Sequence, residues 1–194
     1  MSDRFLDLLR HGEVQGGARF RGGHDDPLTA HGWDQMSRAT ANAADWTGIL
    51  CSPSQRCADF ARRLAETHGL PLRMDTAFGE RDFGAWEGLA AHQIPADQLT
   101  RFWDDPVSYT PPGAETFPAF RERVLNVWNA LSSSDDSHVL LITHGGVIRV
   151  LVAEVLRMPD EACLLFEVPP ASLTRLRIPP PPGRPSLVFH RDVR

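Results

Sequence analysis

Residues 139–143, Val-Leu-Leu-Ile-Thr, form a continuous apolar run that contains no charged residue. Such a run is typical of a strand in a parallel sheet whose two faces are both covered, because a strand with one face in water alternates apolar and polar residues. The run leads directly into His144-Gly145-Gly146, and residues 147–156 then have the composition of an apolar helix. This order predicts that the chain folds around a buried, mainly parallel sheet.

The rest of the chain repeats this alternation of strand and helix patterns. Strands are predicted at residues 5–9, 48–51, 72–74, 163–168, 173–178 and 187–190, and helices at residues 30–44, 53–68, 96–104 and 117–131. Thr29 can cap the first helix, Ser52 and Pro53 have the residue types that open the second, and Gly69 can end it. No repeat or linker interrupts the pattern, so we expect an α/β fold and a single domain over residues 1–194.

The composition excludes several kinds of function. A net charge of −5 provides no basic face for nucleic acid. All 20 basic residues are arginine, which excludes Schiff-base chemistry and the lysine of a P-loop, so an anion site must use arginine, histidine and backbone N–H groups. The N-terminal residues lack the apolar core of a signal peptide, and no apolar run is long enough to cross a membrane. The cysteines, Cys51, Cys57 and Cys163, have no metal-binding spacing. We therefore expect a cytoplasmic protein that binds neither nucleic acid nor membrane.

Three predicted strands end in residues that suit an anion. The first ends in Arg10-His11-Gly12, the second leads into Ser52-Pro53 and Arg56, and the third ends in His144-Gly145-Gly146. Ligands of open α/β sheets bind beyond the carboxyl ends of the strands, where the N-termini of the following helices favour negative charge. We therefore expect His11, His144, Arg10 and Arg56 to converge on one anionic ligand.

A phosphate monoester suits such a pocket. Arg10 and Arg56 would neutralise the phosphate oxygens through forked hydrogen bonds, so that the neutral imidazole of His11 could attack phosphorus and form a phosphohistidine. His144, protonated once phosphate is bound, would stabilise the developing charge. The leaving alkoxide needs a general acid, and the residue types alone leave Glu80 and Glu87 as equal candidates.

The same residues carry a resemblance to a known family. In chain order the motifs are Leu9-Arg10-His11-Gly12-Glu13, Pro27-Leu28-Thr29 with Gly32, Ser52-Pro53 with Arg56, Glu80 with Phe83-Gly84 and Trp86-Glu87-Gly88, and Thr143-His144-Gly145-Gly146. These motifs span nearly the whole chain, which resembles the histidine phosphatase superfamily, also called phosphoglycerate mutase-like. The resemblance implies a three-layer α/β/α fold, with a mostly parallel sheet and helices on both faces.

The resemblance also implies roles for individual residues. His11 occupies the position of the phosphorylated histidine, Arg10, Arg56 and His144 the rest of the phosphate pocket, and Glu80, rather than Glu87, the position of the proton donor. The family uses no metal and no cofactor. Within the family, the patterns Ser52-Pro53 with Arg56-Cys57-Ala58 and Phe102-Trp103 with Pro106 are similar to the alpha-ribazole phosphatase branch of cobalamin synthesis. This similarity implies alpha-ribazole phosphate as substrate.

Two loops depart from the family pattern. Many members carry an asparagine soon after Arg-His-Gly, whereas this chain reads Val14-Gln15-Gly16-Gly17, so Arg19 or Arg21 would have to replace that phosphate contact. Where many members read Pro-Pro-x-Gly-Glu-Ser, residues 112–116 read Pro-Gly-Ala-Glu-Thr, which alters the expected lid. We expect substrate-binding roles for Arg21, Gly22, Gly145 and Glu115.

Other functions stay open at this point. The pocket would equally serve a broad-specificity phosphatase for sugar phosphates or phosphoglycerates, or a phosphoglycerate mutase. A mutase must shield its phosphohistidine from water, and this short chain leaves little sequence for a deep lid, which favours hydrolysis. A non-catalytic phosphate-binding protein is a further alternative, against which the full set of two histidines, two arginines and a glutamate argues. We expect a small phosphorylated metabolite as partner, and a homodimer is common among such folds.

The remaining histidines predict no metal site. His24 stands beside Asp25 and Asp26, for which a solvated loop is the simpler interpretation. The others have no ligand spacing and are expected at the surface: His31, His68, His92, His138 and His190.

Overall fold

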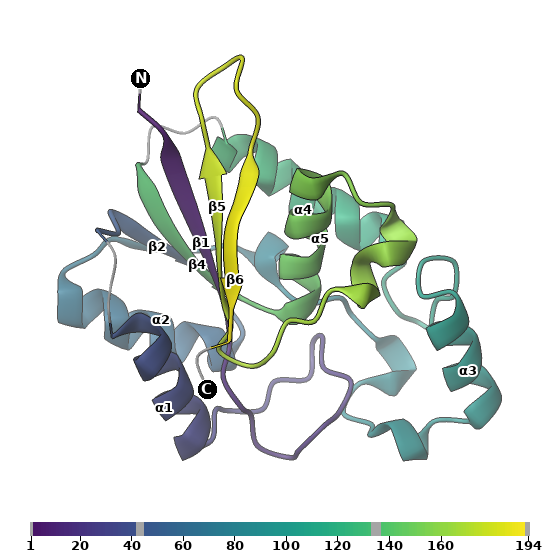
Figure 1. Ribbon diagram of the computed structural model, residues 1–194. Helices are drawn as coiled ribbons and strands as arrows, with labels where there is room; N and C mark the ends of the chain where they lie inside the picture. Colours follow the sequence, from purple (N-terminus) through teal and green to yellow (C-terminus); the bar gives the residue numbers. More distant parts are fainter. Residues whose placement is uncertain (1, 42–44, 133–136, 193–194) are drawn as a thin grey trace.

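The computed structural model describes residues 2–41, 45–132 and 137–192, which fold around a six-stranded sheet (Figure 1). The strands are β1 (Arg4–Arg10), β2 (Gly48–Cys51), β3 (Leu72–Met74), β4 (His138–Thr143), β5 (Leu173–Ile178) and β6 (Ser186–Arg191), in the spatial order β3-β2-β4-β1-β5-β6. The first four strands in this order are parallel, whereas β5 and β6 are antiparallel to their neighbours. The predicted mostly parallel sheet is therefore confirmed.

Helices cover both faces of the sheet, as the three-layer prediction requires. α1 (Ala30–Thr40) and α2 (Gln55–His68) lie on one face, and α4 (Phe117–Ser132) and α5 (Gly145–Leu156) on the other (Figure 1). α3 (Ala96–Asp104) lies away from the sheet, beside the loops that follow β3. Within the described ranges, every helix is too short or too polar to cross a membrane.

Burial on both faces explains the apolar run of β4. Every residue of β4 is buried. Leu141 packs in the apolar cluster under α4 and α5, whereas Leu140 and Ile142 pack in the cluster under α1 and α2. Successive side chains of a strand point to opposite faces, so a strand between two helical layers needs apolar residues at consecutive positions.

The predicted strand at residues 163–168 is wrong. Residues Asp160–Leu165 form a 3₁₀ helix that packs against α5. The six strands of the sheet do not include this segment. Cys163 is buried in the core while Leu165 is 83% exposed, so the apolar composition of this segment does not reflect burial along its whole length.

The observed ends of α1 and α2 agree only in part with the predicted ends. Thr29 caps α1, since its Oγ1 accepts a hydrogen bond from the N–H of Gly32 at 2.9 Å, and Gly69 ends α2 with a left-handed φ of 64°. The predicted helix at residues 30–44 stops at Thr40, and residues 42–44 lie outside the described residues. α2 begins at Gln55 rather than at Pro53, with Ser54 as its N-cap residue. The Ser52 hydroxyl hydrogen-bonds to His144 at 2.8 Å and accepts from the N–H of Ser54 at 3.4 Å.

A buried ionic cluster joins three strands at the centre of the sheet. The carboxylate of Asp7 on β1 accepts hydrogen bonds from Arg175 on β5 at 2.7 and 2.8 Å and from Trp46 at 2.8 Å. His138 on β4 lies 3.1 Å from the same carboxylate. His138 is therefore buried, contrary to its predicted surface position, and His190 is half-buried, whereas His31, His68 and His92 are exposed.

The carboxyl ends of β1, β2 and β4 meet at one edge of the sheet. The N–H of His11 donates to the carbonyl of Thr143 at 3.0 Å, and the N–H of Ser52 donates to the carbonyl of Ile142 at 3.0 Å. The N-terminus of α1 packs tightly against the turn after β1, where a Cβ on Gly12 would collide with the carbonyl of Gly32. The fold thus places the residues after three separate strands side by side.

Candidate active site

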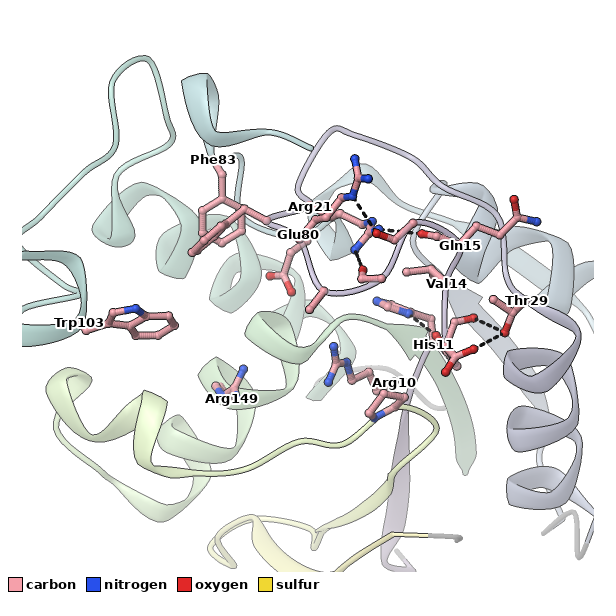
Figure 2. A pocket seen from close by; sticks show the side chains of 18 residues that line it. Arg10, His11, Val14, Gln15, Arg21, Thr29, Glu80, Phe83, Trp103 and Arg149 are labelled. Carbon is pink, nitrogen blue, oxygen red and sulfur yellow. Dashed lines mark hydrogen bonds between the residues drawn. The ribbon is translucent and has the colours of Figure 1, made fainter. Parts of the chain in front are cut away.

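A cavity of about 750 Å³ opens at this edge (Figure 2). Its walls come from the end of β1, the loop at residues 12–21, and residues 80, 83, 103, 149 and 170. Arg10, His11 and Glu80 line it directly. Arg56 and His144 are fully buried next to His11, so the predicted residues gather in one place.

His11 is held in one protonation and hydrogen-bonding state. Its Nδ1 lies 2.9 Å from the carbonyl of Gly12, which can only accept, so Nδ1 carries the proton and Nε2 keeps its lone pair. Burial lowers the pKa of His11 well below 6.5, and the charges of Arg10 and Arg56 lower it further. The imidazole is therefore neutral and nucleophilic at Nε2.

His144 faces His11 from the N-terminus of α5. The two ring centroids are 5.3 Å apart, with 66° between the ring planes. Nε2 of His144 hydrogen-bonds to the Ser52 hydroxyl at 2.8 Å. Burial, followed by the charge of Arg56, lowers the pKa of His144 well below 6.5, so in the free protein this ring is neutral as well.

Unpaired polar atoms mark the position of a ligand. Among the described residues, the buried side-chain nitrogens and oxygens without a hydrogen-bond partner are Nε of Arg10, Nε of Arg56, Nδ1 of His144 and Oγ of Ser172. A buried polar group without a partner costs about 1–3 kcal/mol, so its presence requires an explanation. Three of these atoms are nitrogens of the predicted phosphate pocket, and an anion bound beside His11 would supply the acceptor that each of them needs.

The loop at residues 21–25 holds Arg56. Nη1 of Arg56 donates to the carbonyl of His24 and to the carboxylate of Asp25, both at 3.0 Å, and Nη2 donates to the carbonyl of Gly22 at 3.2 Å. Asp25 also accepts from the N–H of Gln55 at 2.7 Å, at the start of the helix that carries Arg56. These contacts fix the guanidinium in one orientation.

Glu87 orders this same loop. Its carboxylate accepts hydrogen bonds from the N–H groups of Gly22, His24 and Phe83 at 2.9, 2.8 and 2.8 Å. With its oxygens engaged by the backbone, Glu87 serves as a support for the Arg56 loop. Of these two carboxylates, Glu80 lines the cavity and Glu87 does not, so the geometry favours Glu80 over Glu87 as general acid.

Glu80 is positioned from both sides. Its Oε2 accepts from the N–H of Gly146 at 3.0 Å, and its Oε1 accepts from the N–H of Arg81 at 3.0 Å. Arg123 on α4 donates to the carbonyl of Glu80 at 2.9 Å and pairs with Glu115 at 2.7 Å. The backbone that carries Glu80 is thereby tied to α4.

The predicted substrate-binding residues divide into two groups. Arg21 lines the cavity, although its guanidinium donates to Gln15, Gly17 and Asp26, each at 2.7 Å, and so shapes the loop after His11. Gly145 begins α5 beside Arg10 and Arg149. Gly145, Gly22 and Glu115 are not among the lining residues of the cavity. The N–H of Gly22 is bound by Glu87 and the carboxylate of Glu115 by Arg123, so these two residues belong to the framework of the site.

Arg149 and Trp103 line the cavity, although neither was predicted as a site residue. Arg149 lies on α5, four residues after Gly145, and its Nε donates to the carbonyl of Phe166 at 2.9 Å. The spacing could have indicated it, because residues four apart share one helix face. Trp103 of α3, with 56% of its surface exposed, lies on the side of the cavity opposite His11 together with Phe83 (Figure 2). No local pattern indicates this position, because the cavity joins segments that are distant in the chain.

The His24 loop is fully engaged by other contacts. Asp26 pairs with Arg21 at 2.7 Å and lies 3.3 Å from His24, while Asp25 binds Arg56. Over the described ranges, no three or more His, Cys, Asp or Glu side chains gather in a way that could hold a metal ion.

An open α/β sheet whose strand ends gather two histidines, two arginines and a carboxylate defines an enzyme that transfers phosphoryl groups through histidine. Residues 6–192 match the histidine phosphatase superfamily (branch 1), and the chain belongs to this superfamily. The predicted family and the predicted phosphatase class of enzyme are thereby confirmed.

Known proteins of several specificities are similar to the chain. Adenosylcobalamin/alpha-ribazole phosphatase of Escherichia coli (strain K12) is 30% identical over 172 residues, which cover 84% of each chain. A 2,3-bisphosphoglycerate-dependent phosphoglycerate mutase of Rhizobium etli is 33% identical over 192 residues, covering 89% of this chain and 90% of the relative. Among solved structures, a mycobacterial glucosyl-3-phosphoglycerate phosphatase in complex with inorganic phosphate matches with a TM-score of 0.82 at 28% identity, over 98% of both chains.

Proposed function

We propose that the protein hydrolyses phosphate monoesters through a phosphohistidine on His11, and that alpha-ribazole phosphate is its substrate. The observation that carries the proposal is the hydrogen bond from Nδ1 of His11 to the carbonyl of Gly12 at 2.9 Å. It leaves the unprotonated Nε2 as nucleophile, in a pocket whose Arg10, Arg56 and His144 each hold a buried, unpaired nitrogen.

The reaction proceeds in two displacements. Nε2 of His11 attacks phosphorus, the bond between phosphorus and the ester oxygen breaks, and Glu80 protonates the leaving alkoxide. A water molecule, deprotonated by Glu80, then attacks phosphorus and breaks the bond to Nε2. Phosphate leaves and His11 returns to its neutral form.

The buried cations stabilise both displacements. Arg10 and Arg56 hold the equatorial oxygens, where negative charge accumulates. The dianionic phosphate offsets the burial and the positive charges that keep His144 neutral in the free protein, so His144 takes up a proton when substrate binds. Its Nδ1 then donates to the phosphate.

The relative from E. coli, named adenosylcobalamin/alpha-ribazole phosphatase, supports the choice of substrate. The aromatic ring of Phe83 in the cavity wall supports it as well, because the base of alpha-ribazole is a planar ring. We place this reaction in the cytoplasm, which agrees with three buried cysteines that are all unpaired.

A phosphoglycerate mutase is the second candidate, since the relative from Rhizobium etli carries that name. A mutase returns the phosphoryl group to an organic acceptor and must keep water from its phosphohistidine. The exposed rim at Trp103 leaves the cavity accessible to water, which favours hydrolysis.

The test is phosphate release from alpha-ribazole phosphate, several sugar phosphates and the phosphoglycerates. We expect His11→Ala to lower kcat/KM by at least about a thousandfold, because loss of the nucleophile removes the covalent route. His31→Ala, on the exposed side of α1, is the matched control and should leave the rate unchanged.

Each part of the proposal can fail separately. An active His11→Ala variant, or a wild type inert on every ester, would contradict the mechanism. Transfer of phosphoryl groups between phosphoglycerates without phosphate release would identify a mutase. A higher kcat/KM for a sugar phosphate or phosphoglycerate than for alpha-ribazole phosphate would overturn the substrate assignment alone.

A further inference from the structure

A second, smaller cavity of about 100 Å³ adjoins the proposed active site. It shares Glu80, Phe83 and Arg149 with the main cavity, so the two spaces meet at the candidate general acid. Its remaining walls are mostly apolar and include Phe102 of α3, Val107 of the loop after α3, Phe117 and Phe120 of α4, and Leu164 of the 3₁₀ helix Asp160–Leu165. Arg81 and Asp160 also line it, and their side chains are engaged by backbone carbonyls and by Arg121. We refer to it as the apolar annex.

The position of the annex determines which part of a substrate reaches it. The general acid must lie beside the ester oxygen that it protonates. The phosphoryl group is held on the His11 side, so the organic part of the substrate extends past Glu80. The annex begins there, at Glu80 and Arg149, which line both cavities.

The apolar part of the annex disfavours a hydrated group. A sugar hydroxyl or a carboxylate placed among Phe102, Phe117 and Phe120 would lose its water without gaining partners. An apolar cavity of about 150 Å³ accommodates a whole benzene ring, so a space of about 100 Å³ accepts part of one ring. Arg149, at the junction, can stack its guanidinium on that ring or bind a polar atom next to it.

We propose that the annex is a binding subsite for the aromatic end of the leaving group. The proposal rests on the proposed function, since it assigns a substrate class to the same site. The substrates it favours are phosphate monoesters whose alcohol carries an apolar aromatic ring, separated from the phosphate by a polar or flexible spacer. The ring edge occupies the annex, and the spacer passes Glu80.

The experiment compares ligands that differ only in the ring. Phenylalkyl phosphates with spacers of two to four carbons are matched with alkyl phosphates of the same spacer, so the leaving alcohols have nearly equal acidity. We expect the best phenylalkyl ester to exceed its alkyl partner about tenfold in kcat/KM, because burying part of an aromatic ring contributes about one factor of ten. The corresponding phosphonates, which cannot be hydrolysed, should show the same ratio in Kd by calorimetry.

Adjacent leucines provide a matched pair of variants. Leu164 lines the annex, whereas Leu165 is 83% exposed. Leu164→Trp fills the annex and should reduce the ratio of kcat/KM for phenylalkyl over alkyl esters to near one. Leu165→Trp should keep the wild-type ratio. Val107→Phe fills the annex from another segment and replaces Leu164→Trp if that variant does not fold.

The outcomes separate the two proposals. A phenyl advantage in phosphonate binding that disappears in Leu164→Trp, with no ester hydrolysed, would retain the annex and overturn the phosphatase proposal. Equal kcat/KM values for the phenylalkyl and alkyl esters in an active wild type would overturn the annex alone. A phenyl advantage that persists in both annex-filling variants would assign the ring to the rim at Trp103 and also overturn the annex. Failure of every phosphonate to bind would overturn it as well.

Discussion

One hydrogen bond decides the chemistry of His11. The carbonyl of Gly12 accepts from Nδ1, which directs the lone pair of Nε2 into the cavity. The burial and the nearby arginines that depress the pKa of His11 keep this lone pair free below the pH at which an ordinary histidine becomes protonated. The residue after the nucleophile thus determines the tautomer.

Glu80 provides the first prediction at the scale of a residue. In Glu80→Gln, we expect kcat/KM to fall by about a hundredfold or more for an alkyl phosphate and by about tenfold or less for 4-nitrophenyl phosphate. An alkoxide must be protonated as it leaves, whereas a nitrophenolate is stable without a proton. Steady-state kinetics on both esters measure the two losses.

The control for this prediction is Glu66→Gln, an exposed carboxylate on α2. Equal losses on both esters would show that Glu80 acts through its hydrogen bonds to Gly146 and Arg81 and not as an acid.

The sequence predicts the pocket residues more completely than their supports. Arg10, His11 and His144 follow directly from strand ends, because the carboxyl end of a parallel strand is a local feature of the chain. Glu80 and Glu87 could not be separated from their residue types, since Glu87 finds its partners Gly22 and His24 more than sixty residues away. Only the folded chain shows that Glu80 lines the cavity and Glu87 does not.

At the scale of elements, the loop at residues 21–25 connects two motifs that are separate in the sequence. Glu87 binds the N–H groups of this loop, and the carbonyls of the loop bind Arg56. The orientation of Arg56, the proposed phosphate ligand, therefore depends on a carboxylate that does not line the cavity. This arrangement makes Glu87 a positioning residue.

Glu87→Gln tests this role. The amide offers one acceptor oxygen where the carboxylate offers two, so several N–H groups of the loop lose their partner. We expect the inhibition constant of inorganic phosphate to rise about tenfold, and the free energy of unfolding to fall by about 1–3 kcal/mol. Inhibition kinetics and urea unfolding measure the two effects.

Glu122→Gln, exposed on α4, serves as the matched control. If Glu87→Gln lowers stability and leaves the inhibition constant of phosphate unchanged, then Glu87 supports the fold without positioning Arg56.

The elements also show where a composition pattern misleads. Residues 163–168 have the apolar content of a strand, yet residues Asp160–Leu165 form a 3₁₀ helix against α5. Short apolar segments without a regular period fit either structure, and the sheet edge that would have distinguished them is filled by residues 173–191. The order of strands in space is not a local property, so the sequence does not reveal it.

At the scale of the whole molecule, Asp7 links the parallel and antiparallel parts of the sheet. Burial opposes the ionisation of Asp7, but hydrogen bonds from Arg175, His138 and Trp46 outweigh it and lower its pKa from 3.8 to about 2. A carboxyl whose pKa is lower in the folded protein than in the unfolded chain stabilises the fold at pH values above its unfolded-state pKa. This stabilisation is lost as the pH falls through its folded-state pKa.

The cluster predicts a pH-dependent difference in stability. At pH 7 we expect Asp7→Asn to lower the free energy of unfolding by about 2 kcal/mol or more, because the shift corresponds to about that amount and the variant leaves Arg175 without its partner. The difference between wild type and variant should shrink as the pH falls from 4 toward 2. Urea unfolding across this range measures it.

Asp59→Asn, which removes an exposed ion pair with Arg62, should change stability by less than about 1 kcal/mol at every pH. A difference between wild type and Asp7→Asn that stays constant from pH 7 to pH 3 would show that the cluster stabilises by packing and not by charge.

The exposure of Trp103 has a consequence for how ligands can be observed. Trp46, Trp86 and Trp128 are each less than a tenth exposed and Trp33 is only partly so, whereas Trp103 stands at the cavity with 56% of its surface in water. A collisional quencher of indole fluorescence therefore reaches Trp103 first. A molecule that occupies the cavity and covers this ring shields it, so the native emission of the chain reports occupancy without a label and without turnover.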